Sequence, residues 1–315
     1  MLAVHVPTAG QAPVLADLPV PEVGEGTVLI RVKAAGLNAL DNAIAAGAMS
    51  EMIPHEYPLT LGRDAAGIVE AVGAGVHDVA VGDRVVGHVL LRPPLRHGAL
   101  AEFALLPAEA VVPIPDGLDF ATAAALPLAG AAAHAAVEGT EAVAGQVVLV
   151  NGATGGVGGY VVQLLAARGV TVIATGTAAD VDRLTAQGAS TVVDYTNGSV
   201  AEQVTNIHPA GVDALVELVA QNAESSPLSA VKRGGRVSTT TGHPDEATLV
   251  RAGVTGGTVM ASPVGDVIRS LAAATAEGEL VVDVNTLLSL EEALDGLATI
   301  AAGTARGKIV VTIGA

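Results

Sequence analysis

Four glycines stand where the chain could form a phosphate-binding turn. Residues 151–158 read NGATGGVG, with glycines at 152, 155, 156 and 158. The apolar run before them, 146–150, predicts a buried strand, and a helix is predicted over about 157–168. At such a turn, one glycine permits the tight bend, one lets the backbone approach a pyrophosphate, and one lets the helix pack close to the sheet. The helix N-terminus adds free N–H groups and a partial positive charge. This pattern predicts a dinucleotide site; the alternative is a glycine-rich turn that only packs.

The end of the next predicted strand bears on which dinucleotide is bound. A site selective for NAD usually places Asp or Glu there, about 20 residues after the glycines, to bind the ribose hydroxyls. Here Gly176 stands at about that position, between Thr175 and Thr177. Because no carboxylate at that point repels a 2′-phosphate, we expect NADPH. NADH is not excluded, since residues 178–183 contain two aspartates and Arg183 as their one cation.

The elements that must position these residues are of two kinds. The first third of the chain predicts a small β barrel or sandwich, with strands over 28–38, 64–76, 81–90, 99–107 and 110–114. From about residue 115, strands and helices alternate, which predicts a doubly wound parallel sheet covered by helices on both faces. Its strands are 146–150, 170–175, 190–195, 212–219 and 235–241, and its later helices are 180–187, 199–206 and 224–232. The tail predicts a helix over 263–276, a strand over 281–288, a helix over 290–302 and a strand over 308–313.

Composition narrows the chemistry. The 315 residues include no cysteine, which rules out disulfides, a thiolate nucleophile and Cys-ligated zinc. With 15 basic and 32 acidic residues the formal net charge is −17, which argues against nucleic acid or an anionic membrane as a partner. No apolar run approaches a membrane span, and the first residues lack the pattern of a secretory signal. We therefore expect a cytoplasmic protein.

Long stretches of the chain resemble one known family. They include residues 32–47 (VKAAGLNALDNAIAAG), 57–76, 81–88, 145–175 and 305–313 (ARGKIVVTI), in the same order. On these, the chain resembles the zinc-independent quinone oxidoreductase branch of the medium-chain dehydrogenase/reductase superfamily. The zinc-dependent branch has a Cys ligand and Gly-His-Glu where this chain has Leu37-Asn38 and Gly62-Arg63-Asp64. The resemblance therefore implies that no metal takes part.

The resemblance also implies the fold and the reaction. The expected fold class is α/β, with a GroES-like β catalytic domain formed by 1–117 and 264–315 and a Rossmann domain over 118–263. The expected reaction is hydride transfer from NADPH to a small-molecule quinone or α,β-unsaturated carbonyl in a homodimer. The alternatives are a polyketide-type enoyl reductase acting in trans, or an NADPH-binding protein without turnover.

The matching positions imply the site residues. Those implied to bind the cofactor are Gly152, Thr154, Gly155, Gly156, Val157 and Gly158 at the turn, Gly176, Thr177, Arg183 and Tyr195 at the adenosine end, and Thr240, Thr241, Gly242 and Lys308 at the nicotinamide side. Asn38 and Asp41 are the candidate catalytic residues, which would position the nicotinamide or donate to the substrate. The alternatives are a turn residue for Asn38 and a helix N-cap for Asp41. One departure is the stretch Ala178-Ala179-Asp180, where family members often carry Lys or Arg.

Overall fold

The glycine turn belongs to a parallel sheet. The computed structural model describes residues 1–314, and within it Ala132–Ser262 form one compact unit. Its strands run in the order β11-β10-β9-β12-β13-β14, with every neighbouring pair parallel. They are β9 (Val147–Asn151), β10 (Thr171–Gly176), β11 (Thr191–Asp194), β12 (Val212–Glu217), β13 (Val231–Thr239) and β14 (Thr255–Thr258). The strand order reverses between β9 and β12, the point at which doubly wound sheets bind ligands.

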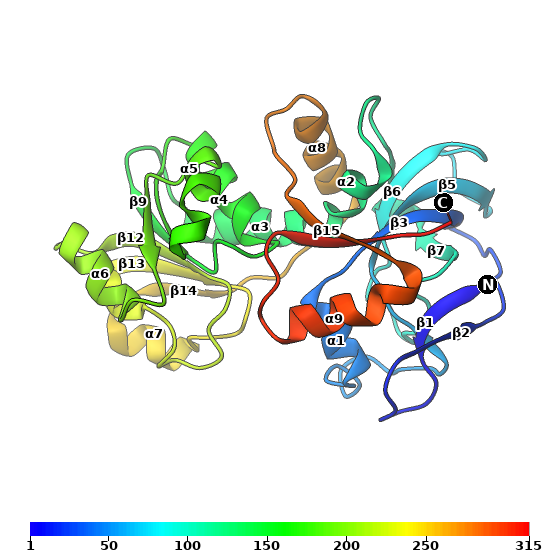
Figure 1. Cartoon of the computed structure of the whole chain (residues 1–315), viewed down its shortest axis with the longest axis horizontal. Coiled ribbons are helices and arrows are strands. Elements are labelled where there is room, and N and C mark those ends of the chain that lie inside the picture. Colours follow the sequence, from blue (N-terminus) through cyan, green and yellow to red (C-terminus); the bar gives the residue numbers. More distant parts are fainter. Residues whose placement is uncertain (315) are drawn as a thin grey trace. The chain divides into compact units, whose positions relative to one another are not determined.

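Helices cover both faces of this sheet. Figure 1 shows α4 (Gly158–Ala167) and α5 (Val181–Ala186) on one side, and α6 (Val200–Ile207) and α7 (Glu246–Ala252) on the other. Side chains of the central strands, such as Leu149, Ile173 and Leu215, are fully buried. This double cover explains why the strands are apolar along their whole length instead of alternating.

One predicted helix of this unit is wrong. Residues 224–232 contain only a 3₁₀ turn, η3 (Leu228–Ala230), and β13 already begins at Val231. Pro227 lacks the N–H that a helix interior needs, and it disfavours helical backbone at the residue before it. Val231 instead pairs with Val212 in the sheet. The prediction also left out α7 and β14, which lie between β13 and the tail.

The second compact unit joins the two ends of the chain. It comprises Met1–Ala131 together with the chain from Pro263 on. Its larger sheet has the order β15-β16-β3-β5-β6-β8, with β7 also paired to β3. These strands are β3 (Thr27–Gly36), β5 (Asp64–Val72), β6 (Arg84–His88), β7 (Phe103–Pro107), β8 (Val111–Pro113), β15 (Val284–Ser289) and β16 (Lys308–Thr312). A smaller sheet contains β1 (Leu2–Val6), β2 (Val14–Asp17) and β4 (Leu59–Thr60).

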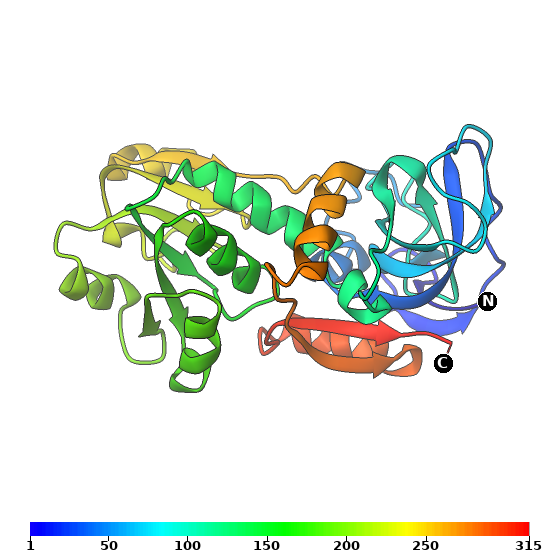
Figure 2. The same ribbon diagram turned by 90° about the horizontal axis from the view of Figure 1, so that it is seen from above.

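The pairing of β16 with β3 is what positions the site in this unit. Val310 lies opposite Gly36 in an antiparallel ladder, so the last strand runs beside the first long one. Figure 2 shows β16 paired with β15 and α9 (Ala293–Ala301) alongside them. The start of β16 is thereby brought next to the end of β3, although about 270 residues separate them in sequence.

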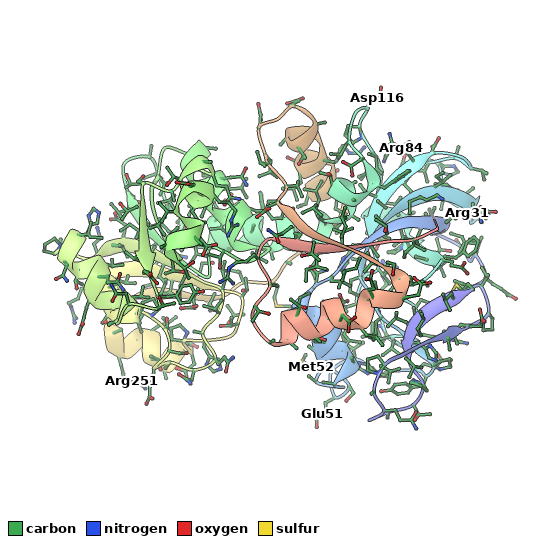
Figure 3. All side chains as sticks on the ribbon, viewed as in Figure 1. Arg31, Glu51, Met52, Arg84, Asp116 and Arg251 are labelled. Carbon is green, nitrogen blue, oxygen red and sulfur yellow. The ribbon has the colours of Figure 1, made fainter. Side chains whose placement is uncertain are left out.

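The remaining helices complete the unit. They are α1 (Ala39–Ala45), α2 (Phe120–Ala124), α3 (Pro127–Thr140, which continues into the other unit) and α8 (Gly265–Ala276). Beyond α1 the side chain of Met52 extends into solvent and is 74% exposed (Figure 3). Among the described residues, none of these helices or the others is long and apolar enough to span a membrane.

Candidate functional site

The turn between β9 and α4 is tight at its two ends and open in the middle. Gly152 has φ +92°, which favours glycine, and its N–H donates to Thr175 Oγ1 at 2.9 Å. A Cβ on Gly158 would lie 2.2 Å from the Gly152 carbonyl oxygen and 2.5 Å from Ala153 Cα. A Cβ on Gly155 would meet only the Gly152 carbonyl oxygen, at 3.6 Å. The space beside Gly155 and the N-terminus of α4 therefore fit a pyrophosphate.

A buried glutamate joins the two strands at which the order reverses. Both carboxylate oxygens of Glu217, at the end of β12, accept from Asn151 Nδ2 at 3.0 Å. Glu217 Oε1 also accepts from the N–H groups of Val219 (3.0 Å) and Ala220 (2.9 Å), and Oε2 from the Ser226 hydroxyl. It fixes the loop beside the glycine turn. Sequence analysis missed this role, although an acidic residue at the end of an apolar strand was a signal for it.

The predicted adenosine-end residues are brought together at the end of β10. The N–H of Tyr195 donates to the carbonyl of Gly176 at 3.3 Å, and Tyr195 is 42% exposed. The N–H and hydroxyl of Thr177 donate to Asp180 Oδ2 at 2.9 and 2.8 Å. The Arg183 guanidinium donates to Asp180 Oδ1 at 3.0 Å and to the carbonyl of Thr154, in the glycine turn, at 3.4 Å.

The loop after β13 lies at the same edge of the sheet as the glycine turn. The N–H of Thr240 donates to the carbonyl of Glu217 at 3.2 Å, which ties this loop to the end of β12. The N–H of Thr241 donates to Thr239 Oγ1 at 3.1 Å, and Gly242 has φ +81°. The loop therefore lies where residues that contact the nicotinamide side of the cofactor were predicted.

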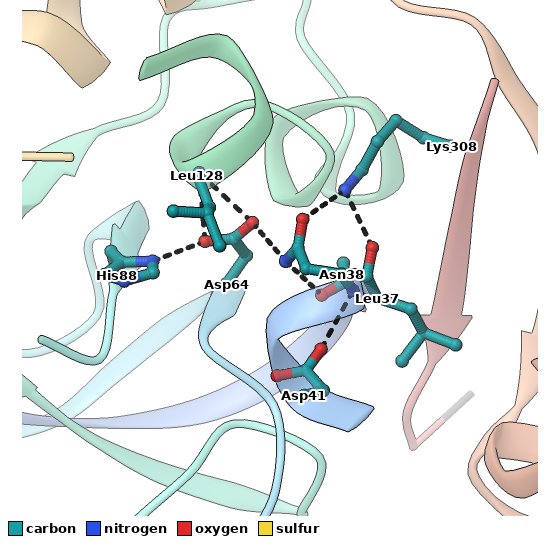
Figure 4. A network of polar contacts seen from close by, with 8 residues as sticks. Leu37, Asn38, Asp41, Asp64, His88, Leu128 and Lys308 are labelled. Atoms are coloured by element: carbon teal, nitrogen blue, oxygen red, sulfur yellow. Dashed lines mark hydrogen bonds and ion pairs between the residues drawn. The ribbon is translucent and has the colours of Figure 1, made fainter. Parts of the chain in front are cut away.

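In the other unit, Asn38 is the N-cap of α1 and joins a buried polar network (Figure 4). Its Nδ2 donates to the carbonyl of Gly36 at 3.2 Å and to Asp64 Oδ2 at 2.9 Å. Its Oδ1 accepts from Lys308 Nζ at 2.8 Å, and Lys308 also donates to the carbonyl of Leu37 at 2.8 Å. The structure thus brings Lys308 to the predicted catalytic Asn38. Burial lowers the pKa of Lys308, whereas the carboxylates of Asp64 and Asp41 act to raise it.

Asp64 lies at the centre of this network, and sequence analysis did not name it as a site residue. Its Oδ1 accepts from His88 Nδ1 at 2.6 Å, and both oxygens accept from the N–H of Leu128, near the start of α3, at 3.2 Å. Its position in Gly62-Arg63-Asp64 was an available signal, because that stretch was compared with the zinc branch.

Asp41 and Arg63 are fully buried close to this network. Asp41 Oδ2 accepts from the N–H of Asn38 at 2.9 Å, so Asp41 completes a capping box at the third position of α1 and is not the N-cap itself. Burial raises the pKa of Asp41 to about 7, opposed by the nearby Arg63 cation. Arg63 Nη2 donates to the carbonyls of Thr60 (3.1 Å) and His97 (2.9 Å). Burial lowers the pKa of Arg63 to about 10, so it stays charged at neutral pH.

These residues do not fit a zinc ion. Within residues 1–314, no group of three His, Cys, Asp or Glu side chains could hold a metal. Asp64 is already engaged by Asn38 and His88, and the buried cation of Arg63 immediately precedes it in the sequence. Zinc sites need three or four deprotonated N, S or O ligands.

Comparison with known proteins identifies the family. The alcohol dehydrogenase GroES-like domain matches residues 24–116, and the zinc-binding dehydrogenase domain matches residues 187–311. The chain is similar to the quinone oxidoreductase of Rattus norvegicus, with 35% identity over 70% of this chain and 66% of that protein. The chain belongs to the quinone oxidoreductase branch of the medium-chain dehydrogenase/reductase superfamily. The predicted family and fold class are thereby confirmed.

Two further proteins show the breadth of the similarity. One is the chloroplastic NADPH-dependent alkenal/one oxidoreductase of Arabidopsis thaliana, which is 33% identical over 72% of this chain and 58% of that protein. The other is the structure of the quinone oxidoreductase from Coxiella burnetii, with a TM-score of 0.88 and 25% identity over 99% of this chain and 98% of that one. The matched region spans about two thirds of the length of the rat relative (66%).

Proposed function

We propose that this protein is an NADPH-dependent reductase of quinones or α,β-unsaturated carbonyl compounds that works without a metal. The observation that carries the proposal is the glycine turn at the point where the strand order reverses. Backbone atoms fill the space beside Gly158, whereas the space beside Gly155 can hold a phosphate group. The names of the rat and Arabidopsis relatives support the quinone and enone substrate classes, and the Arabidopsis name supports NADPH.

The proposal assigns a task to each set of residues. The N–H groups of residues 156–158 donate to the pyrophosphate, since the N–H of Gly155 already donates to the Gly152 carbonyl at 3.2 Å. Gly176, Thr177, Arg183 and Tyr195 surround the adenosine ribose, and Thr240, Thr241 and Gly242 contact the nicotinamide ribose. When bound, NADPH supplies the hydride. Lys308 and Asn38 orient the reacting groups, and the Lys308 ammonium can stabilise negative charge that develops on an oxygen.

The proposal also includes a homodimer and a cytoplasmic location. β14 is the last strand of its sheet and pairs only with β13 among the described residues. Three of its four residues are exposed, and the side chain of Met260, just beyond it, is 78% exposed. An exposed strand edge of this kind can pair with a second copy of the chain.

The test measures binding and turnover separately. Purified protein is titrated with NADPH by nicotinamide fluorescence, and 1,4-benzoquinone or an enone is then added while absorbance at the NADPH band is followed. We expect binding and substrate-dependent oxidation. An Asn38→Ala variant serves as the control for chemistry, with turnover reduced about 100-fold because Lys308 loses the side chain that positions it, and with NADPH binding retained. Binding without turnover on any quinone or enone would instead indicate a non-catalytic protein, and oxidation only with carrier-bound enoyl chains would indicate the polyketide-type reductase.

A further inference from the structure

Among the described residues, Arg183 is the one Lys or Arg that the structure places at the adenosine end of the sheet. Between residues 142 and 231 the chain has only two Lys or Arg residues, Arg168 and Arg183. Arg168 lies just after α4, at the end away from the glycine turn, and it pairs with Glu138. Arg183 instead reaches the carbonyl of Thr154 in the turn itself. A 2′-phosphate bound near Gly176 would therefore depend on Arg183 for its positive charge.

The charge of Arg183 is cancelled by a carboxylate that the fold holds in place. Asp180 Oδ1 accepts from Arg183 at 3.0 Å, in an ion pair whose side chains are 24% (Arg183) and 8% (Asp180) exposed. Asp180 cannot turn away easily, because its Oδ2 is held by both the N–H and the hydroxyl of Thr177. The pair is thus largely shielded from water. Away from water, the attraction between opposite charges is stronger, so the two charges compensate each other more fully.

We propose that Asp180 is the specificity-determining residue of the cofactor site and that it keeps the preference for NADPH over NADH small. The Asp180 carboxylate neutralises Arg183 and adds a repulsive charge near a 2′-phosphate, so the phosphate gains little from the site. The same carboxylate is occupied by Thr177 and Arg183, so it is not placed to select for the ribose hydroxyls of NADH. This inference rests on the proposed dinucleotide binding at the glycine turn and states its cofactor range.

An Asp180→Asn substitution separates the two roles of the side chain. The amide oxygen can still accept from Thr177, which keeps the cap before α5, whereas the amide NH₂ cannot accept from Arg183. The guanidinium then loses this carboxylate as a partner and can bind a 2′-phosphate more strongly, and one negative charge is lost. A charge-assisted hydrogen bond of this kind corresponds to about a tenfold gain in affinity. NADH has no 2′-phosphate, so its affinity should change by less than about twofold on the same reasoning.

Three further variants complete the test. In Arg183→Ala, NADPH binding should weaken while NADH binding is retained. In the double variant Asp180→Asn/Arg183→Ala, the gain in NADPH affinity should disappear, because it requires the guanidinium. Asp182→Asn is the matched control, since Asp182 is exposed in α5, two residues after Asp180, and the loss of its carboxylate changes the net charge equally. Thermal unfolding of each variant reports whether the fold is kept.

Dissociation constants for NADPH and NADH decide the proposal without any measurement of turnover. The expected results are a wild-type preference for NADPH of at most about tenfold and a further gain in NADPH affinity for Asp180→Asn that depends on Arg183. The inference is overturned if Asp180→Asn leaves the ratio of the two constants unchanged, or if Asp182→Asn shifts it equally. In either case wild-type binding of NADPH still upholds the cofactor part of the proposed function. If the wild type binds neither dinucleotide, both proposals fail.

Discussion

Asp64 accepts hydrogen bonds from an imidazole, a side-chain amide and a backbone N–H, and this combination decides how its neighbours point. The amide of Asn38 has its NH₂ toward Asp64 and Gly36, so its oxygen must face Lys308. Without the carboxylate, the amide could turn and present a donor to the ammonium. The order of dependence therefore runs from Asp64 through Asn38 to Lys308. A buried polar network in which each member is satisfied holds a single arrangement.

Asp41 should make the stability of the protein fall as pH rises from about 4 to 7. Burial raises its pKa to about 7 in the folded chain, whereas an unfolded Asp titrates near 4. Between these values the folded protein holds a proton that the unfolded chain has lost, so the free energy of unfolding declines by up to about 1.4 kcal/mol per pH unit. In Asp41→Asn this decline should be smaller by about 1–2 kcal/mol between pH 5 and 7. Urea unfolding at several pH values measures it.

The control for this titration is Glu51→Gln, which removes an exposed carboxylate near α1 (Figure 3). The free energy of unfolding of this variant should change with pH as it does in the wild type. If Asp41→Asn also follows the wild type, Asp41 is already ionised in the folded protein at pH 5, and the Arg63 cation outweighs the effect of burial.

In the turn between β9 and α4, the same Gly→Ala change at two positions should separate an effect on NADPH binding from an effect on stability. In Gly155→Ala the new methyl group meets only one carbonyl oxygen, at 3.6 Å, so the melting temperature should hardly change. The same methyl group would occupy the proposed pyrophosphate space, and NADPH affinity should fall more than about tenfold. In Gly158→Ala the methyl group would lie 2.2 Å from the Gly152 carbonyl oxygen. This clash should reduce the free energy of unfolding by about 1–3 kcal/mol, in addition to weakening NADPH binding.

Thermal unfolding and fluorescence titration of both variants distinguish these outcomes. Equal loss of stability in the two variants would mean that Gly155 is needed for packing like Gly158. Unchanged NADPH binding in a folded Gly155→Ala variant would contradict the assignment of this turn to the pyrophosphate.

At the level of whole elements, local patterns predicted the parallel sheet better than the buried network. The strands β9, β10 and β12 were predictable because an apolar run followed by a turn and a helix is visible within a short window. The contact between Lys308 and Asn38 was not, because it depends on the pairing of β16 with β3 across most of the chain. Without the resemblance to a family, no local signal joined Lys308 to the site. The helix predicted over 224–232 is wrong for a different reason. There Pro227 and the pairing of β13 with β12 prevent a helix, although a local pattern suggested one.

At the scale of the whole molecule, the chain has 32 acidic residues and only 15 Lys or Arg residues to form ion pairs with them. Exposed ion pairs such as Arg31–Glu70 and Arg96–Glu56 lie at 2.9 Å, and pairs of this kind each contribute little to stability. The net charge of −17 leaves most carboxylates without a cation to compensate them, and like charges on a folded surface repel one another. The compact state therefore carries a repulsive term that the unfolded chain relieves.

Salt should accordingly stabilise this protein. Raising NaCl from about 20 to 200 mM shortens the screening length from about 20 to 7 Å, so repulsion between separated carboxylates weakens while short ion pairs lose less. We expect the melting temperature of the cofactor-free protein to rise by about 2–4 °C. Scanning calorimetry in NaCl measures the shift, and choline chloride at equal ionic strength controls for specific binding of sodium. A melting temperature that falls with both salts would show that attractive surface pairs outweigh the repulsion, in spite of the net charge.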